Sequence, residues 1–436
     1  MRMKKQVGGF AVLAIAWGSV VVAGPLTPPA GPIVGTHKTL TEVEPRVALS
    51  QPLAPANGSA MIVISQSGSY YLTSNIVASA GFQGSGIVVS ADDVTLDLNG
   101  FSIVGSGVGN SVSSGISCAS NTGKRLSIRN GKVRNWAGSG IDAKTSGGSN
   151  AVITEVHASD NAGSGFSVSE DSVLTRCTST SNGEHGFHLG TSNTVTDCTA
   201  DNNGSSGFRV GLAGSLRGCT ARFNTQYGFS GNATNSFLNC VARQNSGGGF
   251  SVSAGAVLEG CIADTNGSVG FHGDGNGSTL TGCSAYDNGG TGFSFTGATT
   301  IANCTAFSNG QHGVLVTSGS TVTGGTFRGN TVDGIRASTN CTILNNTCTA
   351  NTGAGILVTG SSGTRVEGNT VTNNGTGVSV SGGAIVVRNT ASKNPATGSV
   401  GANDFVSSGT NAIGQIFDVT AGGTITTGNS FANFKY

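Results

Sequence analysis

Four side chains in one short stretch of the sequence have the types that acid–base chemistry and anion binding require: Glu184, His185, His188 and Arg209. A histidine beside a carboxylate can act as a general base or a general acid, because imidazole titrates near neutral pH. An arginine can hold the carboxylate of a uronic acid through paired N–H donors. Together with Asp142, these residues form a candidate substrate-binding site, and a solvated surface patch is the alternative interpretation.

A second candidate site is basic and contains a tryptophan whose ring could stack on a sugar. Cations gathered on one surface would favour an anionic glycan. Solvated loop charges and a buried turn tryptophan are the alternative interpretation. The members are Lys124, Arg125, Arg129, Lys132, Arg134, Trp136 and Lys144.

Whether these residues meet depends on a repeat that dominates the sequence. Glycine followed by an apolar residue recurs every 21 residues, twice relaxed to 22, from Gly165-Phe166 to Gly377-Val378. Looser copies at Gly86, Gly115 and Gly140 precede these, which makes fourteen in all. Each repeat carries three short alternations of apolar residues, and each alternation predicts a strand. The sequence therefore predicts an all-β protein, a single-stranded parallel β-helix of about 14 coils with three short strands per coil.

Asparagine stands four residues before the glycine in eleven successive coils. Asparagine tolerates the left-handed conformation of a sharp corner, and its amide both donates and accepts hydrogen bonds. The sequence thus predicts an asparagine ladder at one corner. Its expected members are Asn161, Asn182, Asn203, Asn224, Asn245, Asn266, Asn288, Asn309, Asn330, Asn351 and Asn373.

Cysteine forms a second column, nine residues before the glycine in seven coils, from Cys177 to Cys304. Equivalent side chains on adjacent parallel strands point the same way, which does not suit disulfide geometry. We interpret these residues as buried thiols that act as small apolar side chains, with disulfides as the alternative. Zinc is less favoured, because no CxxC pair or nearby histidine accompanies the column. We expect no metal site and no cofactor.

Stacked strands lie ~4.8 Å apart, so counting coils measures height. One outward column contains Asp142, Ser167, His188 and Arg209 in successive coils, which places Asp142 two coils before His188. His185 and His312 are six coils apart, ~29 Å by the same spacing. On another column we expect surface ion pairs between Asp201 and Arg222 and between Arg243 and Asp264.

Regions outside the repeat complete the predicted organisation. Residues 1–23 have a basic start, an apolar stretch and a small-residue cleavage site ending at Ala23, as in a secretory signal peptide. Residues 24–60 form a Pro-rich extended leader and residues 61–393 the β-helix domain, regular from about 86 to 380. Residues 394–436 are expected to cap the last coil, because an open coil exposes unpaired strand edges. We expect a protein that is secreted or at the cell surface, without a transmembrane segment after cleavage.

The short coils, the corner asparagines and the segment Val94-Thr-Leu-Asp-Leu-Asn-Gly100 resemble the parallel β-helix repeat proteins of the pectin-lyase-like superfamily. The resemblance covers roughly residues 60–400 and extends to exported bacterial members that open with a Pro-rich leader. It implies a right-handed solenoid and, in the enzymatic branches, binding or cleavage of acidic polysaccharides. The catalytic motifs of polygalacturonases, alginate epimerases and pectate lyases are missing, so catalytic residues stay unknown.

Two function classes remain open. The first is a secreted β-helix protein that binds or modifies extracellular, acidic polysaccharide; if it is an enzyme, it resembles a polysaccharide lyase or a glycoside hydrolase. The second is a non-catalytic surface or adhesive structural solenoid. The net charge of +1 argues against nucleic acid as a partner. We reject an ice-binding solenoid on the premise that no outward column is a regular threonine array.

Overall fold

The computed structural model describes residues 46–53, 59–107, 113–119, 121–144, 150–360, 363–395, 403–419 and 428–436. The chain divides into two units, residues 1–45 and residues 46–436. The expected signal peptide and most of the Pro-rich leader therefore lie outside the described residues, and these domain boundaries stay predictions.

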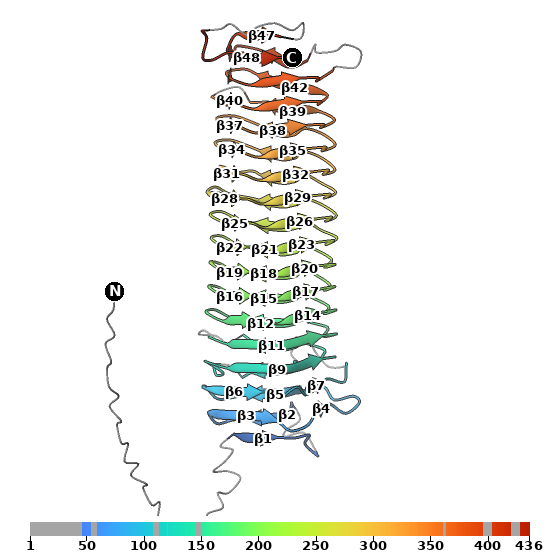
Figure 1. The fold of residues 1–436 in the computed structure, drawn as a ribbon. Helices are drawn as coiled ribbons and strands as arrows, with labels where there is room; N and C mark the ends of the chain where they lie inside the picture. The colour runs from blue at the N-terminus through green and yellow to red at the C-terminus, as the bar shows by residue number, and fades with distance from the viewer. Residues whose placement is uncertain are drawn as a thin grey trace, which may run out of the picture. The chain divides into compact units, whose positions relative to one another are not determined.

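The second unit is a stack of coils in which parallel strands lie directly above one another (Figure 1). One strand of each coil joins a 16-stranded parallel sheet, with partners in register such as Phe187 with Phe208 and His188 with Arg209. Its strands are β2 (Ala60–Ile64), β5 (Ser85–Val89), β8 (Ile116–Cys118), β10 (Ile141–Ala143), β12 (Phe166–Val168), β15 (Phe187–Leu189), β18 (Phe208–Val210), β21 (Phe229–Gly231), β24 (Phe250–Val252), β27 (Phe271–Gly273), β30 (Phe293–Phe295), β33 (Val314–Val316), β36 (Ile335–Ala337), β39 (Ala354–Val358), β42 (Thr376–Ser381) and β45 (Phe405–Ser408).

The other two strands of each coil join a 32-stranded sheet. In the regular coils they form pairs of short strands, from β13 (Val173–Thr175) and β14 (Thr178–Thr180) to β43 (Ile385–Val387) and β44 (Thr390–Ser392). The remaining early and late members are β1 (Val47–Leu49), β3 (Gly68–Leu72), β4 (Ile76–Val77), β6 (Val94–Asp97), β7 (Ser102–Val104), β9 (Ser127–Arg134), β11 (Val152–Ser159), β46 (Ala412–Ile413), β47 (Ile416–Asp418) and β48 (Asn433–Lys435). The predicted parallel β-helix with three strands per coil is confirmed.

The coil count needs a small correction, because the 16-stranded sheet has two strands more than the fourteen predicted. The additional strands are β2 before the first predicted coil and β45 after the last. Met61 and Asp404 occupy the position that glycine occupies in the other coils, so the sequence pattern missed both. β45 pairs in parallel with β42, so the expected cap region, residues 394–436, contributes a further strand to this sheet.

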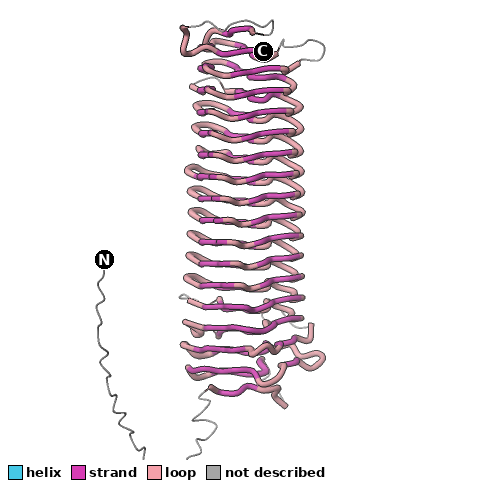
Figure 2. The backbone as a smooth tube through the Cα atoms, in the orientation of Figure 1, coloured by secondary structure: helices cyan, strands magenta, loops and turns pink. Residues whose placement is uncertain are grey.

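Strand and loop account for the whole described part of the chain (Figure 2). In those residues no helix is long and apolar enough to cross a membrane.

The apolar core is a column of stacked rings in the middle coils. Seven phenylalanines from Phe166 to Phe293 are fully buried and nearly parallel, with neighbouring centroids 4.6 to 4.9 Å apart. The preceding glycine is required by close packing. A Cβ atom at Gly186 would lie 2.6 Å from the carbonyl oxygen of Gly207 and 2.8 Å from the Cβ of Ala200. The recurring Gly-Phe pair thus combines the closest backbone approach with the largest buried side chain.

The asparagine ladder is confirmed, with one member reassigned. Asn182 donates from Nδ2 to Oδ1 of Asn203 at 3.0 Å, and its backbone N–H donates to the same oxygen at 3.2 Å. After Asn351 the ladder continues to Asn374 rather than Asn373. Asn373 is the exposed, left-handed residue of that corner, with φ of 57°.

The cysteine column is buried and its thiols are free, as predicted. Its purely apolar interpretation is wrong, however, because these side chains also form hydrogen bonds. The backbone N–H of Cys177 donates to Sγ of Cys198 at 3.3 Å, and the thiol of Cys177 donates to the carbonyl oxygen of Ile153 at 3.4 Å. The thiol therefore serves as a corner residue that both donates and accepts.

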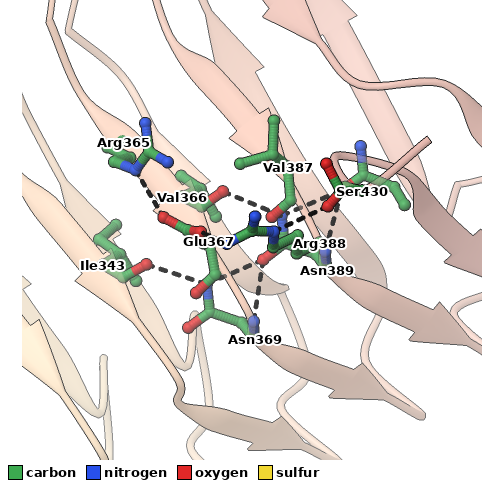
Figure 3. Close-up of polar contacts among 10 residues, drawn as sticks. Ile343, Arg365, Val366, Glu367, Asn369, Val387, Arg388, Asn389 and Ser430 are labelled. Atoms are coloured by element: carbon green, nitrogen blue, oxygen red, sulfur yellow. Dashed lines mark hydrogen bonds and ion pairs between the residues drawn. The ribbon is translucent and has the colours of Figure 1, made fainter.

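Asparagine takes over this second corner in the late coils. Asn369 donates to Oδ1 of Asn389 at 2.9 Å and to the carbonyl oxygen of Ile343 (Figure 3). Beside this ladder, Glu367 accepts hydrogen bonds from Arg365 at 2.6 Å and from Arg388 at 2.9 Å (Figure 3). Cysteine and asparagine thus occupy equivalent corner positions in different coils.

The surface of the 32-stranded sheet confirms the expected ion pairs and corrects one premise. Asp201 lies 3.0 Å from Arg222, and Arg243 lies 3.0 Å from Asp264. Beside them runs an outward column in which eight of eleven positions are threonine, which contradicts the premise used against ice binding. The eight are Thr178, Thr199, Thr220, Thr305, Thr326, Thr347, Thr370 and Thr390. The column is interrupted by Val241, Ile262 and Ser284 and flanked by charges, so it does not extend into a regular two-dimensional array.

Candidate functional site

The outward column of the 16-stranded sheet brings the first candidate residues together. Asp142 on β10 pairs with Ser167 on β12, Ser167 with His188 on β15, and His188 with Arg209 on β18. Side chains on one column project from the same face because the alternation along each strand is in phase. Asp142 and His188 therefore lie two strands apart, as the sequence predicts.

Lys144 also belongs to this first group. Its Nζ atom lies 3.1 Å from Nδ1 of His188. Because an ammonium group can only donate, Nδ1 of His188 accepts and any proton on the neutral ring resides on Nε2. We had assigned Lys144 to the basic patch, and its position after β10 was not enough to show this contact.

His185 lies at the corner that precedes β15, the strand that carries His188. Its ring meets the ring of His188 edge-on, with centroids 5.4 Å apart. The backbone N–H of Ser206, one coil further on, donates to Nδ1 of His185 at 3.3 Å. Glu184 accepts a hydrogen bond from the hydroxyl of Ser164 at 3.2 Å. Glu184, His185, His188, Arg209 and Lys144 thus occupy two adjacent coils and the end of a third.

The electrostatics of the group keep both imidazoles neutral. Burial, Lys144 and the neighbouring His185 together lower the pKa of His188 to about 4. Burial and the Arg209 guanidinium also lower the pKa of His185, while Glu184 opposes this shift. Burial raises the pKa of Asp142 above its usual value. At neutral pH the group therefore presents two uncharged rings beside two exposed cations, Lys144 and Arg209.

The basic patch is divided between the two sheets: five of its cations lie on or just before β9 of the 32-stranded sheet, whereas Lys144 follows β10 of the 16-stranded sheet. Arg125 is paired with Asp93 at 2.5 Å and Arg129 with Asp97 at 2.9 Å, both near the start of β9. Lys132 is in the second half of β9, in register with His157 of β11. Arg134 follows on the same half of that strand, whereas Lys124 lies in the preceding turn.

Trp136 offers no stacking platform. Its side chain is 3% exposed, and its indole N–H donates to the carbonyl oxygen of Ile103 at 3.3 Å. The ring is part of the apolar core, as in the alternative interpretation. The patch therefore lacks the aromatic surface that would have recognised a sugar face.

A further pair of ionisable residues, His312 and Asp333, was not among the residues predicted from the sequence. Both are buried, and Nδ1 of His312 lies 3.2 Å from Oδ2 of Asp333. They occupy the corner position immediately before the glycine in two successive coils, the same column as His185. Their separation of 21 residues places them on successive coils, so the repeat alone could have indicated this pair.

In the part of the chain that the structure describes, neither candidate site coincides with the pocket found there or with a cluster of metal-binding side chains. A pocket of about 220 Å³ lies in the first coils, lined by Gln51, Met61, Val77 and Phe82 among others, and it carries no titratable side chain. Among the described residues, no three or more His, Cys, Asp or Glu side chains are placed to hold a metal ion. The first group is consequently a feature of the open sheet surface.

Comparisons with known proteins concern the fold. The sequence model described as "Right handed beta helix region" matches residues 60–230, 214–337 and 270–434. No curated protein sequence matches the chain.

Solved structures of similar fold have low identity. The A-module of a mannuronan C-5 epimerase from Azotobacter vinelandii is 14% identical, with 80% of this chain and 88% of that chain covered and a TM-score of 0.40. A pectate lyase, Pel9A, is 19% identical over 71% and 70%, with a TM-score of 0.29. Tailspike protein 3 of bacteriophage CBA120 is 10% identical over 82% and 59%, with a TM-score of 0.36. At TM-scores this low, the similarities give no information about the activity of this chain.

Proposed function

The chain belongs to the right-handed β-helix family, and from this premise we propose that it binds an acidic polysaccharide on the open face of its 16-stranded sheet. The binding group is formed by Lys144, His188 and Arg209, with His185 and Glu184 at its border. A fold does not determine a function, so the proposal depends on the chemistry of this group.

The contact between Lys144 and His188 carries the proposal. An ammonium group 3.1 Å from an imidazole nitrogen holds that ring neutral, and Arg209 on the next strand adds a second cation. Among the described residues, neither cation has a carboxylate partner within salt-bridge distance, whereas Arg222 and Arg243 are each paired with an aspartate. An anionic ligand would supply the missing counter-charge, and a carboxylate of a uronic acid matches the guanidinium fork.

Binding to a uronate polymer tests the proposal. We expect Arg209→Ala and Lys144→Ala each to weaken binding roughly 10-fold or more, because a hydrogen bond to a charged group contributes about 1.5–3 kcal/mol. The matched control is Arg243→Ala, which removes the same charge from the 32-stranded sheet and should leave affinity unchanged. Isothermal titration calorimetry at low and high salt measures the affinity of the wild type and of each variant. Absence of binding to every uronate polymer, or equal losses in the control, would contradict the proposal.

A structural or adhesive rod is the second candidate. One observation favours it: the candidate group lies on an open sheet surface, away from the pocket in the first coils. A rod predicts that cells lose surface attachment when the protein is deleted, although the purified protein binds no glycan.

We also propose export of the protein, with cleavage after Ala23. N-terminal sequencing of the mature protein tests this directly. A mature chain that begins at Gly24 agrees with the proposal, and a chain that keeps Met1 contradicts it.

A further inference from the structure

His312 and Asp333 form a buried ionisable pair with an unusual hydrogen-bond problem. Their side chains are 11% and 5% exposed. Oδ1 of Asp333 accepts the backbone N–H of Ala354 at 2.8 Å, but Oδ2 has no hydrogen-bond partner. The carboxylate has little freedom to move, because even a Cβ atom at Gly353 would lie 2.5 Å from Oδ1.

Nδ1 of His312 faces two competing groups of the next coil. The backbone N–H of Asp333 approaches it at 3.4 Å, and Oδ2 of the same residue approaches it at 3.2 Å. The nitrogen can accept from the amide or donate to the carboxylate, but the neutral ring cannot do both there. A buried carboxylate oxygen without a donor costs more free energy than a lengthened amide hydrogen bond. The proton therefore belongs on Nδ1.

We propose that His312 and Asp333 form a base site in which Asp333 fixes the Nδ1–H tautomer and leaves the Nε2 lone pair of His312 free to take a proton. The proton donor is the C5–H group of a bound uronate residue, so the identity of the ligand rests on the proposed function. In this step the C5–H bond breaks and the Nε2–H bond forms, the electron pair of the C–H bond forms the C4–C5 double bond as the C4–O bond breaks, and the leaving oxygen takes the proton back from Nε2. The Asp333 carboxylate balances the charge of the resulting imidazolium.

His185 provides an internal contrast in the same column. The residue that follows it one coil later is Ser206, whose backbone N–H donates to Nδ1. His185 is thus held as the Nε2–H tautomer and offers a donor at the position where His312 offers an acceptor. The residue 21 positions after each histidine decides which nitrogen is protonated.

Nitrogen-15 NMR of the histidine rings tests the tautomer without any ligand. At a pH where the rings are neutral, we expect His312 of the full-length protein to carry its proton on Nδ1 and His185 on Nε2. In Asp333→Asn the amide can donate to Nδ1, so the proton of His312 should move to Nε2. His185 should not change. A wild-type His312 protonated on Nε2 would overturn the proposal.

A second pair of variants separates this inference from the proposed function. His312→Gln should abolish any turnover of a uronate polymer, followed as unsaturated-uronate absorbance or reducing ends, while binding stays within about 2-fold. His272→Gln, an outward histidine four coils from His188, is the control. If the NMR result holds but no uronate polymer binds, the proposed function fails and the base site stands. If uronate binds but turnover is equal in wild type and His312→Gln, the base site has no role and the inference fails.

Discussion

The early and late regular coils fill the same backbone path with different side chains. From β12 to β30 the core column is phenylalanine and the second corner carries cysteine, whereas from β33 to β42 the column is valine or isoleucine and asparagine reaches the corner at Asn346. The asparagine ladder of the first corner runs through both parts without a break. The comparison teaches that one continuous ladder can hold the register while the core composition changes around it.

Truncation of a core side chain should reveal the largest difference in stability between the early and the late coils. Phe229 stacks on Phe208 and Phe250 and meets Phe237 edge-on. We expect Phe229→Ala to lower the free energy of unfolding by about 3–5 kcal/mol, through lost burial and lost ring contacts. Ile335→Ala, its counterpart in the late coils, should cost less. Denaturant unfolding of both variants measures this, and a larger loss at Ile335 would contradict it.

Removing a member of the asparagine ladder, which is common to both parts, should have the second-largest effect on stability. Asn245 donates to Asn266 at 2.9 Å and accepts from Asn224 at 2.9 Å. We expect Asn245→Ala to cost ~1–3 kcal/mol, because it leaves buried partners unsatisfied. The control is Asn202→Gly, because Asn202 is exposed at the neighbouring corner position and glycine keeps its left-handed conformation without strain. An unchanged melting temperature for Asn245→Ala would argue against a stabilising ladder.

The cysteine corner allows a smaller test. The thiol of Cys240 donates to the carbonyl oxygens of Leu216 and Leu238 at 3.6 Å. Cys240→Val keeps the apolar volume and removes these weak hydrogen bonds, so we expect a loss of about 0.5–1.5 kcal/mol. A valine variant as stable as the wild type would show that these thiol hydrogen bonds contribute no net stability.

Protonation should give the smallest effect, confined to the coil that carries His188. Its pKa of about 4 lies below the ordinary value of about 6.5. The unfolded chain therefore binds this proton first, and the folded state loses stability as pH falls from about 6.5 to 4. Lys144→Ala should raise the pKa of His188 and weaken this loss. An NMR titration of the ring checks the pKa, and an unchanged value would exclude Lys144 as a cause.

Particular residues show where sequence reasoning stopped. The positions of Asp142, His188 and Arg209 follow from counting, because their strands pair in register despite the four additional residues between Asp142 and Ser167. Lys144 lies after a strand, where its position in the repeat does not determine the direction in which its long side chain points. Trp136 could not be placed because the early coils are irregular, and Asn374 was missed because the corner shifts by one residue there.

The sequence by itself determined the parallel β-helix, the corner asparagines and the height of each residue, because a strict period converts position along the chain into position along the stack. Only the tertiary structure decided which polar atoms meet. Lys144 reaches His188, a carboxylate oxygen of Asp333 is buried against His312, and cysteine replaces asparagine as a corner donor. These contacts depend on side-chain direction and on competition for single hydrogen-bond partners, which no periodic pattern records.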